Sequence, residues 1–474
     1  MKKITELFKK IKKNDFLRII IELISLLFLF NINEYIGLVL LLLIVVEIVL
    51  SKNVEDIISI FLFLSYNDEV LKMDILKGSI SRVVMIVIAL KLIYHIIKNK
   101  IPIQKKHIFI TIFFLISCLV SITNIIEEGI VFLNIFIFVL FSIVASHDIK
   151  KKDKFIEKIC LTIVISVLCS IIYGLLTANF LEYVQNEKTM YRFNGTYEPN
   201  FMCMYINMAI LSLITIKDKF KKWAYYLIFA IFLNAVILTM SMTGLISLCV
   251  CLFIYVIMFR KQWKELLLRG VYIFIISGLM LFGIKQINTG KYVYWVKNNG
   301  IANSSVVNQN NNNKETEDFI DMEKNYYDED QESGNIEDRF ERIKYLLLKG
   351  KFDILTSGRT ALIRSFAKAS FNRSFFRIMF GNNLLNKKVY SSFFNRECYS
   401  HNTFIDFLYN FGIVGFCIIV WYIFYTTIKN KFLNECIVSS KYVKNIKLIR
   451  IMLIIFALSL TLYPKRMILI FFLL

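Results

Sequence analysis

The chain has 474 residues, of which 57% are hydrophobic, and its mean hydropathy is +0.59. A soluble domain is ordinarily about 45–50% apolar, so this composition argues against a water-soluble enzyme or binding domain. The 17 glycines and 3 prolines are too few for the many turns of a β-barrel. The formal net charge of +21 does not indicate a nucleic-acid partner, because the lysines stand in short clusters between apolar blocks, as they do in membrane proteins.

The apolar residues form blocks of roughly 16–25 residues, long enough to cross a hydrocarbon core of about 30 Å as helices. The predicted blocks are 16–32, 35–50, 54–67, 79–97, 107–123, 129–146, 159–177, 199–216, 223–241, 243–259, 266–286, 403–428 and 449–463. The sequence therefore predicts an all-α integral membrane protein with about 12–14 transmembrane helices. It also predicts one large extracytoplasmic loop that contains short helices.

Charged residues predict which side of the membrane each connection occupies. The basic segment 1–18 places the N-terminus in the cytoplasm, and the apolar stretch after it has no small-residue cleavage site. The short block 54–67 has to cross, because otherwise every later lysine cluster would lie outside. With this block counted, the cytoplasmic segments are all rich in lysine, and they are 98–106, 147–158, 217–222, 260–265 and 429–448.

Two longer segments then face the outside, 178–198 and 287–402. The larger one separates N-terminal transmembrane helices (1–286, about 11 spans) from C-terminal transmembrane helices (403–474). Residues 301–335 are polar, acidic and low in complexity, which predicts disorder. A loop as long as 287–402 usually carries function.

The pattern in the second half of the large loop predicts helices that lie on the outer face of the membrane. Apolar residues recur at helical spacing over 336–350 and 357–380, with Ser357 as the cap of the second helix. Four phenylalanines of that helix are expected to face lipid or the core, and they are Phe366, Phe371, Phe375 and Phe376.

Arginine, unlike lysine, is concentrated outside. Eight of the fourteen arginines fall there, namely Arg192, Arg339, Arg342, Arg359, Arg364, Arg373, Arg377 and Arg396. A planar guanidinium holds a phosphate through two parallel hydrogen bonds, which makes these residues candidate anion ligands. Two of them stand beside acidic residues and are expected to pair with those instead, Arg339 and Arg342. The like-charge pairs four residues apart, Arg364/Lys368 and Arg373/Arg377, call for an anion such as a phosphate or a lipid headgroup between them.

His401 is placed outside by this topology, whereas His95, His107 and His147 fall at cytoplasmic ends of spans. With a reference pKa of about 6.5, histidine is the most frequent general base near neutral pH. His401 is therefore either a catalytic base or a structural residue at a membrane boundary, and the arginine-rich segment before it favours catalysis. Asn402 either orients the imidazole or caps the following span.

The order of these residues resembles the O-antigen polymerase and O-antigen ligase superfamily. The resemblance rests on Ser-Gly-Arg at 357–359, then Gly381, His-Asn-Thr-Phe-Ile-Asp at 401–406 and Gly-Ile-Val-Gly at 412–415. Upstream, 192–200 reads Arg-Phe-Asn-Gly-Thr-Tyr-Glu-Pro-Asn and is similar to the arginine-to-Pro-Asn turn before a central span of that family. Two departures are evident. Residues 241–244 read Ser-Met-Thr-Gly where the family often has an arginine after Ser-x-Ser, and no second glycine follows Gly381 two residues on. We expect Gly412 and Gly415 to permit close helix packing.

The resemblance implies a glycosyltransferase of a bacterial plasma or inner membrane. Its donor would be an undecaprenyl-diphosphate-linked oligosaccharide, polymerised on the outer face into a capsule- or O-antigen-like polysaccharide. The resemblance also implies that His401 is catalytic and that Arg192 and Arg359 bind the diphosphate. We add Arg364 and Arg396 from the same arginine-rich segment as further diphosphate ligands.

Asn200 and Asn402 are expected to support these residues. No cluster of metal ligands is evident in the outer segments, so we expect a metal-independent reaction without a cofactor. The expected partners are lipid-linked oligosaccharides, membrane lipids, and flippase and chain-length regulator proteins; nucleic acid is not among them.

Three alternatives remain open. A ligase of the same superfamily would move a finished glycan from the same donor linkage to another acceptor. A flippase for lipid-linked sugars would be expected to show internal repeats and paired charges within its spans, but no repeat is evident, and Glu22, Glu47 and Arg82 form no clear pair in the sequence. A glycosyltransferase that uses polyprenyl-monophosphate sugars typically has an acidic motif in a large first outer loop, which here is only 31–34.

Overall fold

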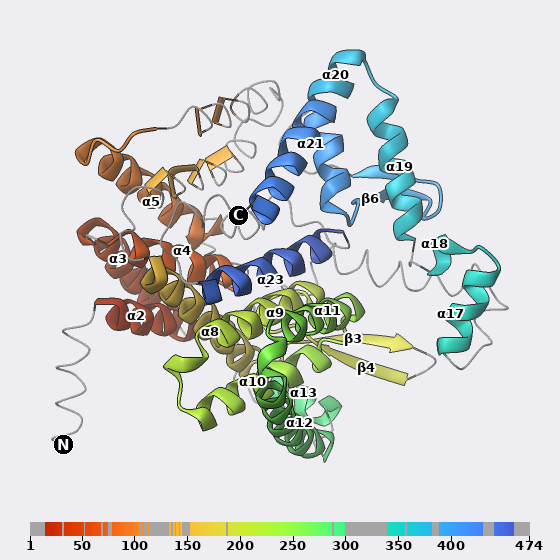
Figure 1. Cartoon of the computed structure of the whole chain (residues 1–474), viewed down its shortest axis with the longest axis horizontal. Helices are drawn as coiled ribbons and strands as arrows, with labels where there is room; N and C mark the ends of the chain where they lie inside the picture. Colours follow the sequence, from red (N-terminus) through yellow and green to blue (C-terminus); the bar gives the residue numbers. More distant parts are fainter. Residues whose placement is uncertain are drawn as a thin grey trace.

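The computed structural model describes residues 15–30, 33–51, 53–67, 70–73, 78–103, 152–185, 188–286, 289–298, 339–355, 358–381, 388–429 and 440–458, with short runs between 107 and 144. The described chain is mostly helical, as predicted. It forms a bundle of helices from residues 15–286 and 440–457, and a smaller unit from residues 339–429 beside it (Figure 1). We call the smaller part the α17–α21 unit.

Most predicted apolar blocks coincide with a bundle helix to within a few residues. The bundle helices are α2 (Asp15–Phe30), α3 (Glu34–Leu50), α4 (Val54–Tyr66), α5 (Ile80–Lys98), α8 (Lys152–Leu176), α9 (Pro199–Thr215), α10 (Lys222–Leu238), α11 (Met242–Met258), α12 (Trp263–Gln286) and α23 (Ser440–Ala457). The 3-10 turns η2 (Lys217–Lys219) and η3 (Arg260–Gln262) precede α10 and α12. Helices α8 and α23 begin about two turns before the apolar blocks, because their first turns carry lysines that hydropathy does not register. The blocks 107–123 and 129–146 lie mostly outside the described residues.

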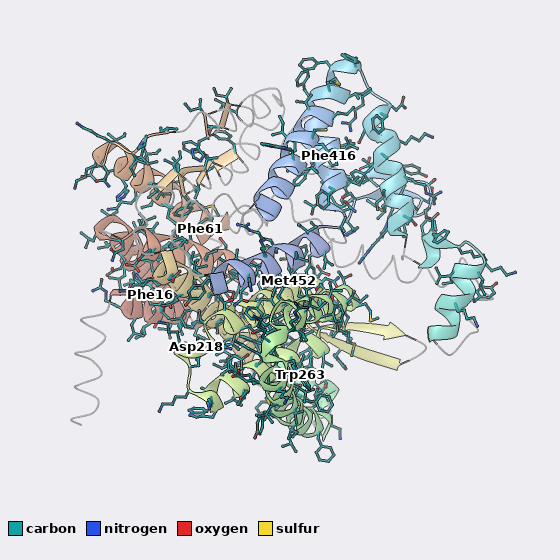
Figure 2. All side chains as sticks on the ribbon, in the orientation of Figure 1. Phe16, Phe61, Asp218, Trp263, Phe416 and Met452 are labelled. Atoms are coloured by element: carbon teal, nitrogen blue, oxygen red, sulfur yellow. The ribbon has the colours of Figure 1, made fainter. Side chains whose placement is uncertain are left out.

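Three helices in the described part of the chain are long and apolar enough to cross a membrane: Asp153–Leu176, Arg260–Gly283 and Thr403–Trp421. Shorter apolar helices cover Tyr35–Leu50, Pro199–Thr215, Lys222–Leu238 and Met242–Met258. Helix α12 buries little of its surface, and its apolar side chains, among them Trp263 (Figure 2), are largely exposed. A helix that is apolar without protein around it is typical of a lipid-facing span.

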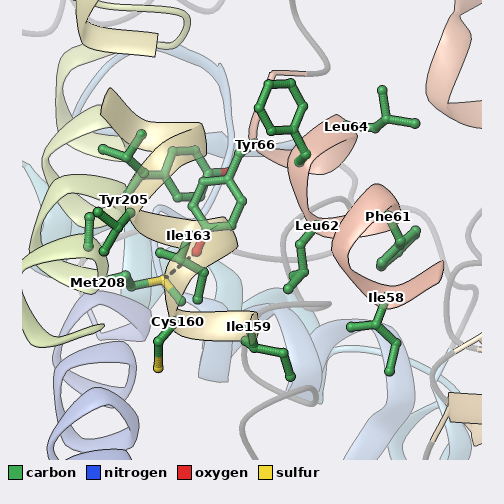
Figure 3. Packing of buried hydrophobic residues seen from close by; sticks show 14 of the residues in the cluster. Ile58, Phe61, Leu62, Leu64, Tyr66, Ile159, Cys160, Ile163, Tyr205 and Met208 are labelled. Atoms are coloured by element: carbon green, nitrogen blue, oxygen red, sulfur yellow. Dashed lines mark hydrogen bonds between the residues drawn. The ribbon is translucent and has the colours of Figure 1, made fainter. Parts of the chain in front are cut away.

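The core of the bundle lies where α4, α8 and α9 meet. Tyr66 is almost completely buried there, and its hydroxyl donates to Met208 Sδ at 3.4 Å (Figure 3). Its ring centroid lies 4.6 Å from that of Tyr205. Cys160 and Ile163 of α8 belong to the same cluster (Figure 3). Among lipid tails, close packing and such hydrogen bonds hold helices together, because the surrounding phase is as apolar as the core.

Polar contacts join the helix ends in two separate groups. In the first group Lys158 Nζ, near the start of α8, lies 3.1 Å from Asp56 Oδ1 at the start of α4. The neighbouring Glu157 accepts from Tyr442, at the start of α23, at 2.7 Å and lies 2.8 Å from Lys219 Nζ after α9. The starts of α4, α8 and α23 therefore lie together with the end of α9.

The second group joins the opposite ends. Tyr197, just before α9, donates to the carbonyl of Ser65, at the end of α4, at 2.6 Å. Asn402, just before α21 (Thr403–Lys429), donates to the carbonyl of Leu458, just after α23, at 2.9 Å. Tyr292 of α13 (Thr289–Asn298) donates to a carbonyl near the end of α8.

Two carboxylates within the predicted spans are paired, which corrects the sequence-based expectation. Arg18 Nη2 lies 2.5 Å from Glu47 Oε2, and Arg18 Nε lies 3.8 Å from Glu22 Oε1. The sequence does not reveal these pairs, because Arg18 lies at the end of the basic segment 1–18 and was counted with its lysines. It joins the start of α2 to the end of α3, so these charges belong to the first group of helix ends. The side chain of Arg82 lies outside the described residues.

Three short antiparallel hairpins, none of them predicted, depart from an all-α architecture. They are β1 (Lys72–Met73) with β2 (Gly78–Ser79), β3 (Phe180–Gln185) with β4 (Lys188–Phe193), and β5 (Val389–Ser391) with β6 (Arg396–Cys398). The β3–β4 hairpin projects from the bundle toward the α17–α21 unit (Figure 1). The β3–β4 hairpin lies within the segment 178–198, which the sequence predicts only as an outer loop.

The helices of the α17–α21 unit differ in detail from those predicted. They are α17 (Arg339–Leu348), α18 (Phe352–Leu355), α19 (Arg359–Phe371), α20 (Phe375–Phe380) and α21. The single helix predicted over 357–380 is wrong: it breaks between α19 and α20, where Asn372 leaves the helical region with ψ 55°. The cap of α19 is Gly358, at φ 76°, and the predicted cap Ser357 lies outside the described residues, as does 301–335.

Gly412 interrupts α21 with φ 65° and ψ −172°, so the uninterrupted span predicted over 403–428 is two helices. A Cβ on Gly412 would lie 2.5 Å from the carbonyl carbon of Met379. One on Gly381, at φ 80°, would collide with the carbonyl of Asn410. The close packing predicted at Gly412 therefore joins backbone to backbone between α21 and the end of α20.

We expect Gly412→Ala and Gly381→Ala each to lower the free energy of unfolding by roughly 1–3 kcal/mol, because an added Cβ meets backbone at a positive φ. The measurement is the thermal unfolding midpoint of the detergent-solubilised protein. Gly278→Ala is the matched control, because nothing lies within 4 Å of its added Cβ. Equal midpoints for Gly412→Ala and Gly278→Ala would show that the backbone contact does not form.

Candidate functional site

Arg192 is almost completely buried at the end of β4, with 8% of its surface exposed. The β3–β4 hairpin pairs it with Leu181 and turns its side chain toward the bundle. Its Nε donates to the carbonyl of Thr239 at 3.1 Å, and Nη2 donates to Asn200 Oδ1 at 3.2 Å. A guanidinium this deeply buried needs such partners, because an unpaired buried charge is costly.

Asn200 joins Arg192 to a carboxylate. Pro199 begins α9, where its missing N–H and fixed φ suit the first helical position, and Asn200 follows it with 6% of its surface exposed. The side-chain amide accepts from Arg192 and donates to Glu198 Oε1 at 2.7 Å. The predicted supporting residue Asn200 therefore bridges a cation and an anion.

The turn between α10 and α11 closes the other side of this site. Ser241 caps α11 by accepting from the Gly244 N–H at 3.3 Å. A Cβ on Gly244 would collide with Cys203 Sγ of α9, so a larger residue there would require the Cys203 side chain to move. This turn lies directly beside Arg192, whose Nε donates to the Thr239 carbonyl.

Arg359, the first residue of α19, shares the electrostatic environment of Arg192 although the two are far apart in sequence. Burial lowers the pKa of Arg359, the Glu198 carboxylate raises it, and the Arg192 guanidinium lowers it again. The two guanidinium groups and the Glu198 carboxylate therefore lie within range of one another's charge. We call Arg192, Glu198, Asn200 and Arg359 the arginine centre.

The arginine centre carries a formal charge of +1, with its two cations supplied by separate elements. Glu198 and Arg359 are partly exposed, whereas Arg192 and Asn200 are buried. Two guanidinium groups within range of each other repel, and an anion with several oxygens relieves that repulsion through bidentate hydrogen bonds. The arrangement is suited to a phosphate or diphosphate.

The other two predicted diphosphate ligands belong to α19 and β6 of the α17–α21 unit. Arg364 is 70% exposed at its side chain and forms an ion pair with Asp353 of α18. Arg396 lies in β6 and faces the same side of the hairpin as its cross-strand partner Ser391. The structure thus places Arg192 and Arg359 within range of each other's charge and places Arg364 in an internal ion pair.

The like-charge pair of Arg373 and Arg377 is relieved within the chain. The Arg373 guanidinium carbon lies 3.7 Å from the centroid of the Tyr409 ring, and Nη1 donates to the Tyr409 carbonyl at 3.1 Å. Burial lowers the pKa of Arg373, and its contact with Tyr409 raises it. No anion is needed to hold Arg373, because the ring and the carbonyl already do so.

His401 lies at the start of α21 with a backbone φ of 50°, which is uncommon for a residue other than glycine. The next residue, Asn402, is the helix cap: its Oδ1 accepts from the N–H groups of Phe404 at 3.0 Å and Ile405 at 3.1 Å. Ser400, on the other side, donates to Asp406 Oδ1 at 2.5 Å. The two roles left open for Asn402 are thus decided in favour of the cap.

The sequence reading passed over Glu198 and Thr239. Glu198 is the one acidic residue in the 192–200 motif, a signal that was available. Thr239 contributes only its backbone carbonyl. Every residue has that group, so the sequence cannot indicate which one binds Arg192. Among the described residues, no three His, Cys, Asp or Glu side chains lie close enough together to hold a metal ion.

Comparison with known proteins gives no relative to set beside this site: no protein-family model, no curated protein and no solved structure matches the chain.

We expect Asn402→Ala to lower the free energy of unfolding by about 1 kcal/mol, the usual cost of a lost helix cap. Asn402→Asp keeps the acceptor and is expected to lose less. The measurement is again the thermal midpoint in detergent. A thermal midpoint for Asn402→Ala equal to that of the wild type, combined with loss of activity, would contradict the capping role. It would favour a direct role beside His401.

Proposed function

We propose that the protein is a metal-independent glycosyltransferase of the bacterial plasma or inner membrane that polymerises undecaprenyl-diphosphate-linked oligosaccharide repeat units. The observation that carries this proposal is the arginine centre. Two guanidinium groups, one from the segment before α9 and one from the α17–α21 unit, flank a place where a diphosphate would be held. The resemblance in motif order supplies the glycan chemistry.

The helix-end contacts support a topology with about 12–14 spans, a cytoplasmic N-terminus and an extracytoplasmic 287–402. In an alternating topology the starts of α4, α8 and α23 and the end of α9 belong to the cytoplasmic face. These ends are joined through Lys158 and Glu157. The contacts of Tyr197 and Asn402 join ends that the same topology assigns to the outer face. If the short helix α4 did not cross the membrane, its two ends would not make these contacts on opposite faces.

The diphosphate would be the leaving group of the reaction. An acceptor hydroxyl attacks the anomeric carbon of the donor sugar, the new C–O bond forms, and the bond to the lipid diphosphate breaks. His401 takes the proton of the hydroxyl. The electron pair and negative charge leave with the diphosphate, where Arg192 and Arg359 offset them as the charge develops.

A ligase would use the same leaving group, so the arginine centre does not favour either enzyme. A flippase is less well supported. Its spans would need charges along a transport path, whereas the ion pairs of Arg18 and Lys158 lie at helix ends. The proposal is therefore tested through the lipid-linked glycans that accumulate.

We expect Arg192→Gln and Arg359→Gln each to lower polymerisation on the order of 100-fold, the usual effect of losing one transition-state donor. The measurement is a mass profile of lipid-linked glycans in a deletion strain that carries each variant. Single repeat units on lipid should accumulate, as they should with His401→Ala. Arg364→Gln is the matched control, because that arginine is paired with Asp353.

Each alternative predicts a different profile. Long chains that stay on lipid would indicate a ligase, and repeat units trapped on the cytoplasmic side would indicate a flippase. If the Arg192→Gln and Arg359→Gln proteins, present at the wild-type level, made a wild-type amount of polymer, the proposed diphosphate site would be wrong.

A further inference from the structure

An aromatic surface lies where α19 ends and α20 follows. Four phenylalanines expose large parts of their rings: Phe371 (54%), Phe375 (79%), Phe376 (60%) and Phe380 (47%). We call them the phenylalanine patch. Water rarely faces so many large apolar side chains together, and such patches mark contact with another apolar phase.

The patch is not part of the core of its own unit. In that core the ring centroids of Phe366 and Tyr409 lie 5.3 Å apart. Leu362 packs there against Phe394 and Cys398. Helix α20 packs against α21 through the backbone contact of Gly381 and Gly412. Folding of the unit therefore leaves the phenylalanine patch uncovered.

The charge around the patch indicates what covers it. Between residues 358 and 381 the chain has five basic residues and no acidic one. Arg364 and Arg373 are already engaged, by Asp353 and Tyr409. Lys368 and Arg377 are exposed and lie close in the chain to the phenylalanines of the patch. Exposed aromatic rings bordered by basic side chains are typical of surfaces that enter a bilayer with anionic lipids.

We infer that the phenylalanine patch enters the acyl region of the leaflet beside the α17–α21 unit, with Lys368 and Arg377 on anionic lipid headgroups. The unit is thereby anchored at both ends of α19. One end carries the patch, and the other carries Arg359 in the arginine centre, about 20 Å away along a helix of this length. Lipid contact at one end would set the height of Arg359 above the membrane. The anchor requires a membrane protein but not the proposed glycosyl transfer.

The test places a tryptophan in the patch. The full chain with Phe376→Trp is reconstituted in phosphatidylcholine nanodiscs with brominated acyl chains, and its emission is compared with that of the wild type, which has four tryptophans. We expect the added emission to be quenched strongly by the brominated lipid and weakly by aqueous acrylamide. Tyr390→Trp on β5, 56% exposed, is the control with the opposite expected pattern.

Either of two outcomes overturns the inference. Strong acrylamide quenching of Trp at 376 would place the patch in water, and protection from both quenchers would mean that protein, such as a second copy of the chain, covers it. Should Phe376→Trp fail to give a monodisperse protein, Phe375→Trp replaces it at a more exposed position.

Brominated phosphatidylglycerol tests the charged rim. At equal mole fraction it should quench the Phe376→Trp protein more than brominated phosphatidylcholine does, because Lys368 and Arg377 enrich anionic lipid nearby. Adding Arg377→Gln should reduce that preference. An unchanged preference would remove Arg377 from the anchor.

Discussion

The burial of Arg192 is the constraint on which the site depends. A guanidinium with 8% of its surface exposed, at the end of an apolar bundle, has to be paired, because unpaired buried charge is strongly destabilising. The carbonyl of Thr239 and the amide of Asn200 provide the pairing. Their geometry fixes the turn before α11 and the start of α9 relative to the β3–β4 hairpin.

That constraint reaches the α17–α21 unit through electrostatics. Glu198 is held by Asn200 and acts on Arg359, so the carboxylate offsets the repulsion between the two arginines while no ligand is bound. An entering diphosphate would compete with Glu198 for Arg359. The same carboxylate would weaken the affinity for an anion too poor in charge to displace it.

Backbone contact at two glycines holds the other side of the unit. Gly381 and Gly412 adopt positive φ and leave no room for a Cβ between α20 and α21. The interruption of α21 at Gly412 allows this close contact, and it places α20, with its exposed phenylalanines, against the point where the two halves of α21 meet. The arginine centre and the phenylalanine patch lie at opposite ends of α19 as a result.

The sequence by itself determined most helices, because runs such as 199–216 and 243–259 are apolar throughout and few residues in them break a helix. The resemblance in motif order also pointed to Arg192 and Arg359 among the eight arginines that the charge pattern assigns to outer segments. Only the tertiary structure decided that these two arginines lie within range of each other's charge and of the Glu198 carboxylate. Local patterns carry no information about which distant segments pack together. The break at Gly412 and the pairing of Arg18 with Glu47 depended on neighbours in space in the same way.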